Sequence, residues 1–394
     1  MRRSWLRPTA PASFATVTRC EWLADIAVLP HTLLARARLV AEHGRLVAID
    51  QEPPSPAAIH LPGTVLPGAI DLQVNGAGGA SVATATRAAL DTVADAVWAG
   101  GATAFLPTLI TAPFDALLAQ VAAVADWVRN YRGAGATPLG LHLEGPFLQA
   151  PGAHPAPHLI DPTPERLAAL HEAAQGTLRL VTLAHSRNGA AAACAWLRHR
   201  GVAVALGHCS ETAGFAACVD AGATAVTHLF NAMGGLHHRD VGVPALALDE
   251  PRLFGPLILD GVHVHPTMVR HAFRILGPDR TILVTDAVAA AGMPDGTYEL
   301  GGLPVRAERG VVRDSAGRLA GSALTMAAAL RNFAKHVPWV GPWTLAKLAA
   351  TNPARLLGLT DRGGLVVGQH AAFTHWAPDG RLSAVRSHAV RSHG

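Results

Sequence analysis

Lysine, aromatic residues and cysteine are all scarce in this chain, and each scarcity excludes a class of protein. Among 394 residues only Lys335 and Lys347 are lysines, so scattered arginines carry most of the positive charge. No basic run is interleaved with aromatic residues, which argues against a nucleic-acid partner. The four cysteines form no Cys-x-x-Cys pair, and a chain of this length is far larger than disulfide-stapled scaffolds. We therefore expect free thiols in a reducing compartment.

Long apolar segments are also missing. No apolar run reaches the roughly 18 residues that a membrane-spanning helix needs. The first residues, Met1-Arg2-Arg3, resemble the start of a twin-arginine export signal, but Pro8 and Pro11 leave no continuous apolar segment behind them. We expect a cytoplasmic protein without a membrane partner, whose first 30 or so residues are an irregular extension.

Short apolar runs are what the chain does have. Half of its residues are hydrophobic, which is enough to bury a large core. Eight runs recur, most of them nearly continuous, as in strands buried on both faces. They are Val65–Ile70, Ala102–Leu106, Pro138–Leu143, Leu178–Leu183, Val202–Leu206, Ala223–Val226, Gly255–Leu259 and Arg280–Val284. Helical periodicity lies between most of them, over Ala88–Ala99, Phe114–Tyr131, Pro164–Ala173, Ala190–Arg198 and Pro266–Leu276.

This alternation of strands and helices predicts a parallel sheet, and eight strands predict a closed (β/α)₈ TIM barrel over residues 65–354. A doubly wound sheet is the alternative, but no Gly-x-Gly-x-x-Gly follows the first strand. The flanks, residues 1–64 and 355–394, carry short strands and Gly/Pro turns. We expect these two ends to pair into a small, discontinuous β-domain that packs against the barrel.

Polar residues follow six of the eight apolar runs. In a barrel of this type the C-terminal ends of the strands meet at one mouth, so these residues are expected to converge. They are Asp71 to Asn75, His142 to Pro146, Gly207 to Cys209, Thr227 to Asn231, Asp260 to His263, and Thr285 to Ala287.

Three of these residues, Glu144, His208 and His228, form a set of one carboxylate and two imidazoles that suits a divalent ion such as Zn²⁺. Three protein ligands leave a position for water, whose pKa the ion lowers from about 15.7 towards about 7. An amide carbonyl is the natural target of the resulting nucleophile. Asp286 would accept the proton of the water and pass it to the leaving nitrogen.

Two alternatives remain at this point. Asp286 would instead be a further metal ligand, or it would cap the helix that follows. Cys209 would compete as a thiolate ligand, but it follows His208 directly, and neighbours on a strand point to opposite faces. We expect Cys209 to face away from the site.

Nine segments resemble the N-acetylglucosamine-6-phosphate deacetylases of the amidohydrolase superfamily, in the same order and over about 290 residues. They are LPGAIDLQVNGAGG (66–79), GLHLEGPFL (140–148), GAHPAPH (152–158), ALGHCSET (205–212), VTHLFNAMGGL (226–236), LDGVHVHP (259–266), LVTDAVAAAG (283–292), LAGSALTM (319–326) and TNPARLLGL (351–359). The pairing of HLEGP with a later THLFNAM is the most specific feature.

The resemblance implies a barrel with a β-sandwich made from both chain ends, assembled as a homodimer. It implies hydrolysis of N-acetylglucosamine 6-phosphate to glucosamine 6-phosphate and acetate. Carried over by position, it makes Glu144, His208 and His228 the metal ligands and Asp286 the general acid/base. Many amidohydrolases hold a second metal with His-x-His after the first strand, where this chain has Gln73 and Asn75.

Neutral amides are poor zinc ligands, so we expect one divalent ion per chain, zinc first, with iron, manganese and cobalt as alternatives. Gln73 and Asn75 would then hydrogen-bond the site, its water or the substrate.

The resemblance also implies substrate contacts. His154 would orient the acetyl carbonyl and stabilise the oxyanion. Asn231, the backbone of Ala232, and His263 would contact phosphate or sugar, and the turn that begins at Leu319 would close the sugar pocket. Arg239 would reach the phosphate held by the neighbouring subunit, the alternative being an exposed loop arginine.

The chain departs from the family pattern in three places. Residues 184–186 read Ala-His-Ser where the family has Ala-Pro-Glu, residues 368–380 lack the usual strand motif, and residues 384–393 repeat Ala-Val-Arg-Ser-His. Two other functions stay open: an amidohydrolase of an unphosphorylated or cyclic amide, and a barrel that only binds a sugar phosphate.

Overall fold

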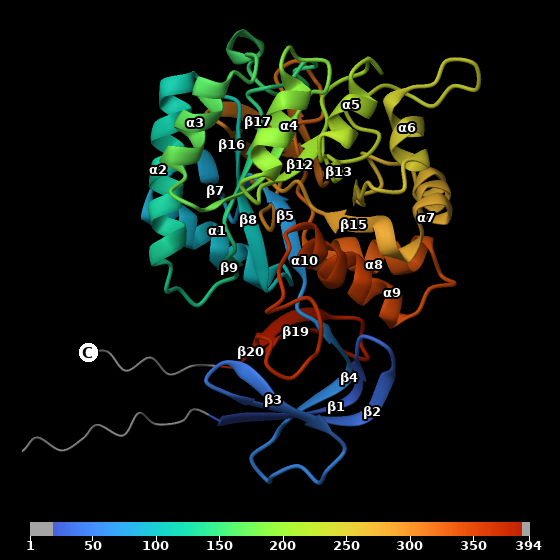
Figure 1. Cartoon of the computed structure of the whole chain (residues 1–394). Helices are drawn as coiled ribbons and strands as arrows, with labels where there is room; N and C mark the ends of the chain where they lie inside the picture. The colour runs from blue at the N-terminus through green and yellow to red at the C-terminus, as the bar shows by residue number, and fades with distance from the viewer. Residues whose placement is uncertain (1–18, 388–394) are drawn as a thin grey trace, which may run out of the picture.

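A barrel of strands and helices stands on a separate β-sheet unit in the computed structural model (Figure 1). The structure describes residues 19–387. Residues 1–18, which are most of the expected irregular extension, and residues 388–394, which include the second copy of the C-terminal repeat, lie outside the described residues.

Eight parallel strands form the barrel, as predicted. They are β5 (Ile70–Val74), β8 (Ala104–Ile110), β10 (Leu141–Glu144), β11 (Leu178–Leu183), β12 (Ala203–Leu206), β13 (Ala225–Val226), β14 (Gly255–Ile258) and β15 (Thr281–Val284). The first six are hydrogen-bonded in that order, with the short β9 (Thr137–Pro138) beside β8, and β14 pairs with β15. Parallel bridges between Ala225 and Phe254 and between Val74 and Ala287 join the two sheets at both edges, so the ring closes.

Eight helices surround these strands (Figure 1). They are α1 (Arg87–Ala99), α2 (Phe114–Asn130), α3 (Pro164–Ala173), α4 (Ala190–Arg198), α5 (Phe215–Asp220), α6 (Val243–Asp249), α7 (Pro266–Arg280) and α8 (Met326–His336). Threonine side chains at Thr86, Thr163 and Thr325 accept backbone N–H groups and start α1, α3 and α8. The predicted ranges of α3 and α4 agree with the structure, whereas α7 runs on to Arg280 across a break at Gly277, whose φ is 67°.

Shorter elements fill the connections. They are β6 (Gly76–Ala77), β7 (Ala80–Ser81), η1 (Val82–Thr84), η2 (Ala156–His158), α9 (Pro342–Ala346), η3 (Lys347–Thr351) and α10 (Asn352–Leu356). None of the helices within residues 19–387 combines the length and the apolar composition needed to cross a membrane.

Both chain ends contribute to one six-stranded sheet, in the order β20-β19-β4-β1-β2-β3. Its strands are β1 (Arg19–Val28), β2 (Leu33–Glu42), β3 (Arg45–Asp50), β4 (Ile59–Pro67), β19 (Ala372–Trp376) and β20 (Leu382–Arg386). The expectation that residues 19–28 are irregular is wrong, because β1 pairs with both β2 and β4. Its alternate side chains, Trp22 among them, enter the core of this sheet, while exposed polar residues obscure the pattern in the sequence.

The predicted first barrel strand, Val65–Ile70, straddles two strands. Residues up to Pro67 belong to β4 of the outer sheet, and the barrel begins at Ile70. Gly68 lies at this junction. The position requires glycine, because a Cβ there would lie 2.3 Å from Thr103 Oγ1 and 2.8 Å from the carbonyl of Ala372. The chain therefore passes directly from the outer sheet into the N-terminal end of the barrel. The boundaries drawn at 64/65 and 354/355 stay predictions, and β4 crosses the first.

A small antiparallel sheet that the sequence did not predict follows β15. It consists of β16 (Gly296–Leu300), β17 (Leu303–Glu308) and β18 (Val311–Asp314). Its inner side chains, such as Leu300 and Val305, pack with Ile110 of β8 and with Val288 beyond β15. It therefore forms a wall beside the C-terminal ends of the barrel strands.

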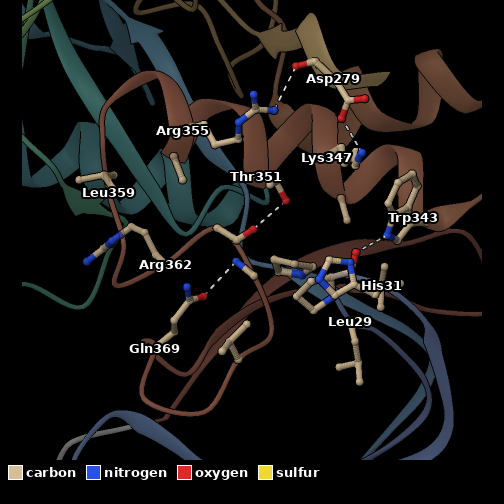
Figure 2. A pocket seen from close by; sticks show the side chains of 18 residues that line it. Leu29, His31, Asp279, Trp343, Lys347, Thr351, Arg355, Leu359, Arg362 and Gln369 are labelled. Carbon is tan, nitrogen blue, oxygen red and sulfur yellow. Dashed lines mark hydrogen bonds and ion pairs between the residues drawn. The ribbon is translucent and has the colours of Figure 1, made fainter. Parts of the chain in front are cut away.

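A cavity of about 550 Å³ lies between the outer sheet and helices α9 to α10 (Figure 2). Here Trp343 Nε1 donates a hydrogen bond of 2.8 Å to the carbonyl of Pro30, which ties the two units together. Lys347 Nζ lies 3.9 Å from the centre of the Trp343 ring and 2.5 Å from Asp279 Oδ1, so its charge is already partnered. These contacts explain the cavity as part of the junction between the two units.

The aromatic pair Trp22 and Phe373 joins the two chain ends, with ring centres 5.1 Å apart and edge to face. Both side chains are at most 1% exposed. We expect Phe373→Ala to lower the free energy of unfolding by about 3–5 kcal/mol through lost burial and the remaining cavity. Val367→Ala, at a side chain 57% exposed, is the control and should change it by less than about 0.5 kcal/mol. Chemical denaturation measures both; equal effects would contradict this account of the sheet.

Candidate active site

A cavity of about 310 Å³ opens at the C-terminal ends of the barrel strands. It lies at the opposite end of the barrel from the outer sheet, because β4 leads into the start of β5. Most residues predicted for the site line it: Asn75, Glu144, His154, His208, His228, Asn231, Ala232, His263, Asp286 and Leu319. Ile110 and Leu300 supply apolar walls. Gln73 and Arg239 do not line this cavity.

Glu144 at the end of β10 meets two imidazole nitrogens in the barrel interior. Its Oε1 is 3.0 Å from His228 Nε2 and 3.2 Å from His208 Nε2, and these two nitrogens are 3.2 Å apart. A tetrahedral zinc ion with bonds of about 2.0–2.1 Å to nitrogen has ligand atoms about 3.3 Å apart. The three atoms therefore stand close to the spacing that such an ion requires.

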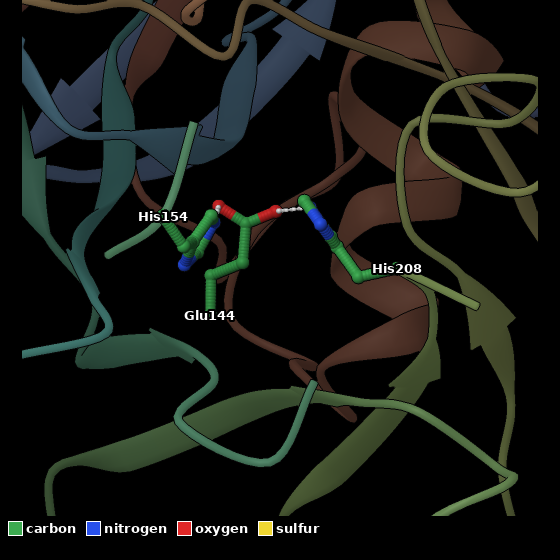
Figure 3. Close-up of side chains that lie close together, drawn as sticks. All are labelled: Glu144, His154 and His208. Atoms are coloured by element: carbon green, nitrogen blue, oxygen red, sulfur yellow. Dashed lines mark hydrogen bonds and ion pairs between the residues drawn. The ribbon is translucent and has the colours of Figure 1, made fainter. Parts of the chain in front are cut away.

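A second buried group contains Glu144, His208 and His154, whose ligand atoms lie within 4.8 Å of one another (Figure 3). His154 Nε2 is 3.6 Å from the other carboxylate oxygen, Glu144 Oε2. Three imidazoles thus surround one carboxylate, and distance alone does not decide which of them would bind a metal. The hydrogen bonds of the outer ring nitrogens distinguish His208 from His154.

His208 has its outer nitrogen fixed as a donor. Nδ1 lies 2.9 Å from the carbonyl of Ala150, which can only accept, so Nδ1 carries the proton. In the neutral ring this leaves a lone pair on Nε2, the atom that faces Glu144. The backbone of His208 is also fixed, because the N–H groups of Gln149 and Ala150 donate to its carbonyl at 3.1 and 2.7 Å. His208 is therefore held as a metal ligand would be.

His154 has the opposite arrangement. Its Nδ1 accepts the backbone N–H of Thr111 at 3.4 Å and lies 3.0 Å from Thr111 Oγ1. Because Nδ1 accepts, the ring proton sits on Nε2, which then faces Glu144 as an N–H donor. A donor of this kind binds a substrate oxygen or an anion rather than a metal. Sequence reasoning did not identify Thr111, and only its place after a barrel strand could have suggested it.

His228 offers Nε2 to the same centre, and its Nδ1 has no hydrogen-bond partner among the described residues. Burial alone would raise the pKa of Glu144, but the close imidazoles of His154, His208 and His228 outweigh it and hold the pKa well below its usual range. Glu144 is thus an anion although it is only 3% exposed. An anion at this depth suits a cation at the centre of the group.

Asp286, just beyond β15, is placed differently from Glu144. Burial, followed by the negative charge of Glu144, raises the pKa of Asp286 to about 6. Its Oδ1 accepts hydrogen bonds from Gln73 Nε2 at 3.1 Å and Asn75 Nδ2 at 2.8 Å. Within residues 19–387 no hydrogen bond to Oδ2 is seen, so that oxygen is left for chemistry. The two amides therefore hold a carboxylate here, and Asn75 Oδ1 remains without a partner in the same part of the chain.

The chain is strained where it presents these groups. Three residues have positive φ angles: 50° at His208, 24° at His228 and 51° at Asp286. These values lie in the left-handed region that residues other than glycine seldom occupy. Each such residue costs about 1–3 kcal/mol and persists only where its surroundings fix it. Such strain at the ends of three strands indicates a functional site at the mouth of the barrel.

The outer part of the cavity contains His263 and the turn from His228 to Asn231. His263 Nδ1 lies 2.6 Å from Asp260 Oδ2, so Asp260 fixes the ring through its outer nitrogen. Asn231 Nδ2 donates to the carbonyl of His228 at 3.1 Å and holds the turn that contains Ala232, whose φ is 53°. Sequence reasoning gave Asp260 no role, although its position three residues before His263 was the available signal.

Arg239 and Cys209 lie away from the cavity. Arg239 sits on an exposed loop over residues 234–241, where Leu236 and Val241 are also exposed, by 46% and 53%. Cys209 faces away from the site, as expected, with Sγ 3.1 Å from Ser186 Oγ. His185 donates from Nε2 to the carbonyl of Glu211 at 2.6 Å and braces the same region.

Comparison with known proteins matches this architecture. The amidohydrolase family model covers residues 64–388. An N-acetylglucosamine-6-phosphate deacetylase from Vibrio furnissii is 37% identical over 350 residues, 86% of each protein. An N-acetylgalactosamine-6-phosphate deacetylase from Escherichia coli O157:H7 is 38% identical over 310 residues, 78% of this chain and 81% of that protein.

A solved structure gives the same picture. A mutant N-acetyl-D-glucosamine-6-phosphate deacetylase from Mycobacterium smegmatis, in complex with N-acetyl-D-glucosamine-6-phosphate, has a TM-score of 0.88 and 36% identity to this chain. The match covers 94% of this chain and 98% of that one.

The positions of the ring protons lead to a prediction of which histidines are required for metal binding. We expect His208→Ala and His228→Ala to lose most bound metal after gel filtration, because each removes a lone pair from the centre. His154→Ala should keep about one ion per chain, because its Nε2 is a donor. Elemental analysis of the purified variants measures this. A His154→Ala protein without metal, beside a His228→Ala protein that retains it, would reverse the assignment.

Proposed function

The chain belongs to the amidohydrolase family, and we propose that it hydrolyses the acetamide of N-acetyl-D-glucosamine 6-phosphate to D-glucosamine 6-phosphate and acetate. The observation that carries the proposal is the meeting of Glu144, His208 and His228 with Asp286 in one cavity of a chain similar to deacetylases of this substrate. The remaining paragraphs assign a task to each residue.

Glu144, His208 and His228 hold one divalent ion. Zinc suits one carboxylate and two imidazoles, and iron, manganese or cobalt fit the same ligands. When bound, the ion acts as a Lewis acid and activates water for attack on the acetyl carbonyl at neutral pH. A second ion is not expected, because Gln73 and Asn75 direct their amide N–H groups to Asp286.

Asp286 moves the proton. A carboxyl whose pKa is about 6 is ionised at neutral pH yet basic enough to take a proton from water at Oδ2. It then gives that proton to the amine that leaves. Asn75 Oδ1, buried and without a partner among the described residues, is an acceptor for the water or for the substrate.

His154 supplies the oxyanion contact. With its proton held on Nε2 by Thr111, the ring donates a hydrogen bond to the carbonyl oxygen as negative charge develops there. Its 6% exposure keeps water away from this contact. The apolar side chains of Ile110 and Leu300 line the same cavity.

The phosphate end of the substrate lies towards Asn231, Ala232 and His263, and the turn at Leu319 covers the sugar. Arg239, exposed and outside the cavity of its own chain, completes the phosphate site of a neighbouring subunit in a homodimer. The four cysteines are free, as suits work in the reducing cytoplasm.

N-acetyl-D-galactosamine 6-phosphate is the second candidate substrate, because a relative named for it is 38% identical to this chain. An acetate-release assay decides between the two sugars. We expect kcat/KM to be highest for N-acetyl-D-glucosamine 6-phosphate, lower for the galactosamine epimer and lowest for unphosphorylated N-acetylglucosamine. Chelation should abolish release and added zinc should restore it. Equal rates with and without phosphate would favour the amidohydrolase of an unphosphorylated amide.

Arg239→Ala tests the phosphate contact within this assay, with Arg309→Ala as control at a surface arginine 87% exposed. A lost charged hydrogen bond of about 1.5–3 kcal/mol corresponds to a drop of roughly 10- to 100-fold in kcat/KM for the phosphorylated sugar alone. An Arg239→Ala protein as active as Arg309→Ala would remove Arg239 from the site.

Asp286→Asn tests the proton carrier. The amide keeps the shape of the side chain, so the metal content should not change. Because an amide does not accept a proton, kcat should fall by about 10²- to 10⁴-fold. Near-normal turnover would remove Asp286 from its role, and loss of the metal would identify it as a ligand instead.

A further inference from the structure

Asp71 in β5 is a buried carboxylate outside both the metal group and the cavity. It is 2% exposed, and no ion pair joins it to any residue within 19–387. Its hydrogen bonds come instead from its own strand and from Thr285, the residue before Asp286. Thr285 Oγ1 donates to Asp71 Oδ2 at 2.6 Å, and the N–H groups of Thr285 and Gln73 donate to Oδ1 at 3.2 and 3.4 Å.

The hydroxyl of Thr285 links the residues on either side of Asp286. While it donates to Asp71, it also accepts the backbone N–H of Ala287 at 3.2 Å. The residues before and after Asp286 are thus tied to one side chain, which Asp71 holds in place. Burial raises the pKa of Asp71 to about 7. A buried carboxyl group is expensive compared with an apolar side chain, and these hydrogen bonds account for its presence at this position.

Ser322 fixes the same segment from the other side. Its hydroxyl donates to the carbonyl of Thr285 at 2.6 Å, and its N–H donates to the carbonyl of Asp286 at 2.8 Å. Between these contacts Asp286 has the left-handed φ of 51°. That conformation determines where the carboxylate stands relative to Gln73 and Asn75, and a misplacement of about 1 Å can cost roughly 10²-fold in rate.

We propose that Asp71 is a positioning residue that acts through the hydroxyl of Thr285 to hold Asp286 in its strained backbone conformation, with Oδ2 facing the reacting atoms. The proposal rests on the proposed function, because it assumes that Asp286 carries the proton. It makes β5 and the residue that follows it responsible for both the backbone and the side chain of Asp286: Asp71 supports the backbone, and Gln73 with Asn75 supports the side chain.

The matched pair Thr285→Val and Thr285→Ser tests the hydroxyl. Valine keeps the shape and removes both hydrogen bonds, so kcat should fall at least about 10-fold while KM and metal content stay near the parent values. Serine keeps the hydroxyl and should stay within about threefold of the parent. A parallel fall of kcat in both variants, or no fall in either, would overturn the proposal.

Asp71→Asn and Asp71→Val separate positioning from folding. An asparagine at this position still accepts the backbone N–H groups of Thr285 and Gln73 through its side-chain oxygen, and its amide donates to Thr285 Oγ1. The hydroxyl of Thr285 can then donate its own proton to the carbonyl of Gln73, 3.4 Å away. Asp71→Asn should therefore rescue most of the kcat that Asp71→Val loses. The double variant Asp71→Val with Thr285→Val removes both side-chain partners of the contact together, so that neither the hydroxyl nor the carboxyl is left without the other, and its kcat should be no lower than that of Thr285→Val alone. Additive losses would contradict action through one bond.

The Asp286→Asn background distinguishes failure of this proposal from failure of the proposed function. If Asp286 carries the proton and Asp71 acts through it, then Thr285→Val should cause no further loss of kcat in that background. A further 10-fold loss there would overturn the positioning role while leaving the function intact. Normal turnover of Asp286→Asn itself would instead refute the proposed role of Asp286 and, with it, this proposal.

Discussion

The contact between the buried carboxylate of Glu144 and two imidazole nitrogens at 3.0 and 3.2 Å is the constraint on which the rest of the site depends. A carboxylate that is 3% exposed stays ionised only if its surroundings compensate the charge. The barrel provides this compensation because its strands end at one mouth, so that β10, β12 and β13 each deliver one group to the same point. The strained backbone of His208 and His228 follows from the same demand, since both rings must turn inward just after their strands end. Packing that fixes these turns is the contribution of the whole fold to the site.

Hydrogen bonds one step away from the centre assign the three imidazoles different tasks. The carbonyl of Ala150 makes His208 a donor at Nδ1 and therefore leaves a lone pair at Nε2, as a metal ligand requires. The N–H of Thr111 makes His154 an acceptor at Nδ1 and therefore a donor at Nε2. The two rings lie only 4.7 Å apart, so their different roles come from backbone groups and not from distance to Glu144. An N–H donor beside a metal group is what an acetyl carbonyl needs when its oxygen becomes negative.

The sequence allowed the barrel and most of the cavity lining to be predicted, because both depend on local patterns. Continuous apolar runs mark buried strands, and the polar residues after them meet wherever parallel strands close into a ring. The register of the first strand was missed, since Val65 to Ile70 is apolar on both sides of the junction at Gly68 and only the contact with Thr103 and Ala372 divides it. The sheet of β16 to β18 was missed because its strands are short and half exposed. The ring protons of His154 and His208 depend on backbone groups up to 58 residues away in sequence, and no motif encodes them.

Glu144 and Asp286 show how one cavity separates two carboxylates. The close imidazoles of His154, His208 and His228 hold the pKa of Glu144 well below its usual range, whereas burial and the charge of Glu144 raise the pKa of Asp286 to about 6. The first is therefore suited to remain an anion against a cation, and the second to gain and lose a proton near neutral pH. This separation requires Asp286 to keep a fixed place close to Glu144 while like charges push them apart. Two amides on its Oδ1, from Gln73 in β5 and Asn75 just after it, supply that restraint together with a backbone that Thr285 and Ser322 hold through hydrogen bonds. In this chain the end of the first barrel strand therefore supports Asp286, the carboxyl group that we propose as the proton carrier.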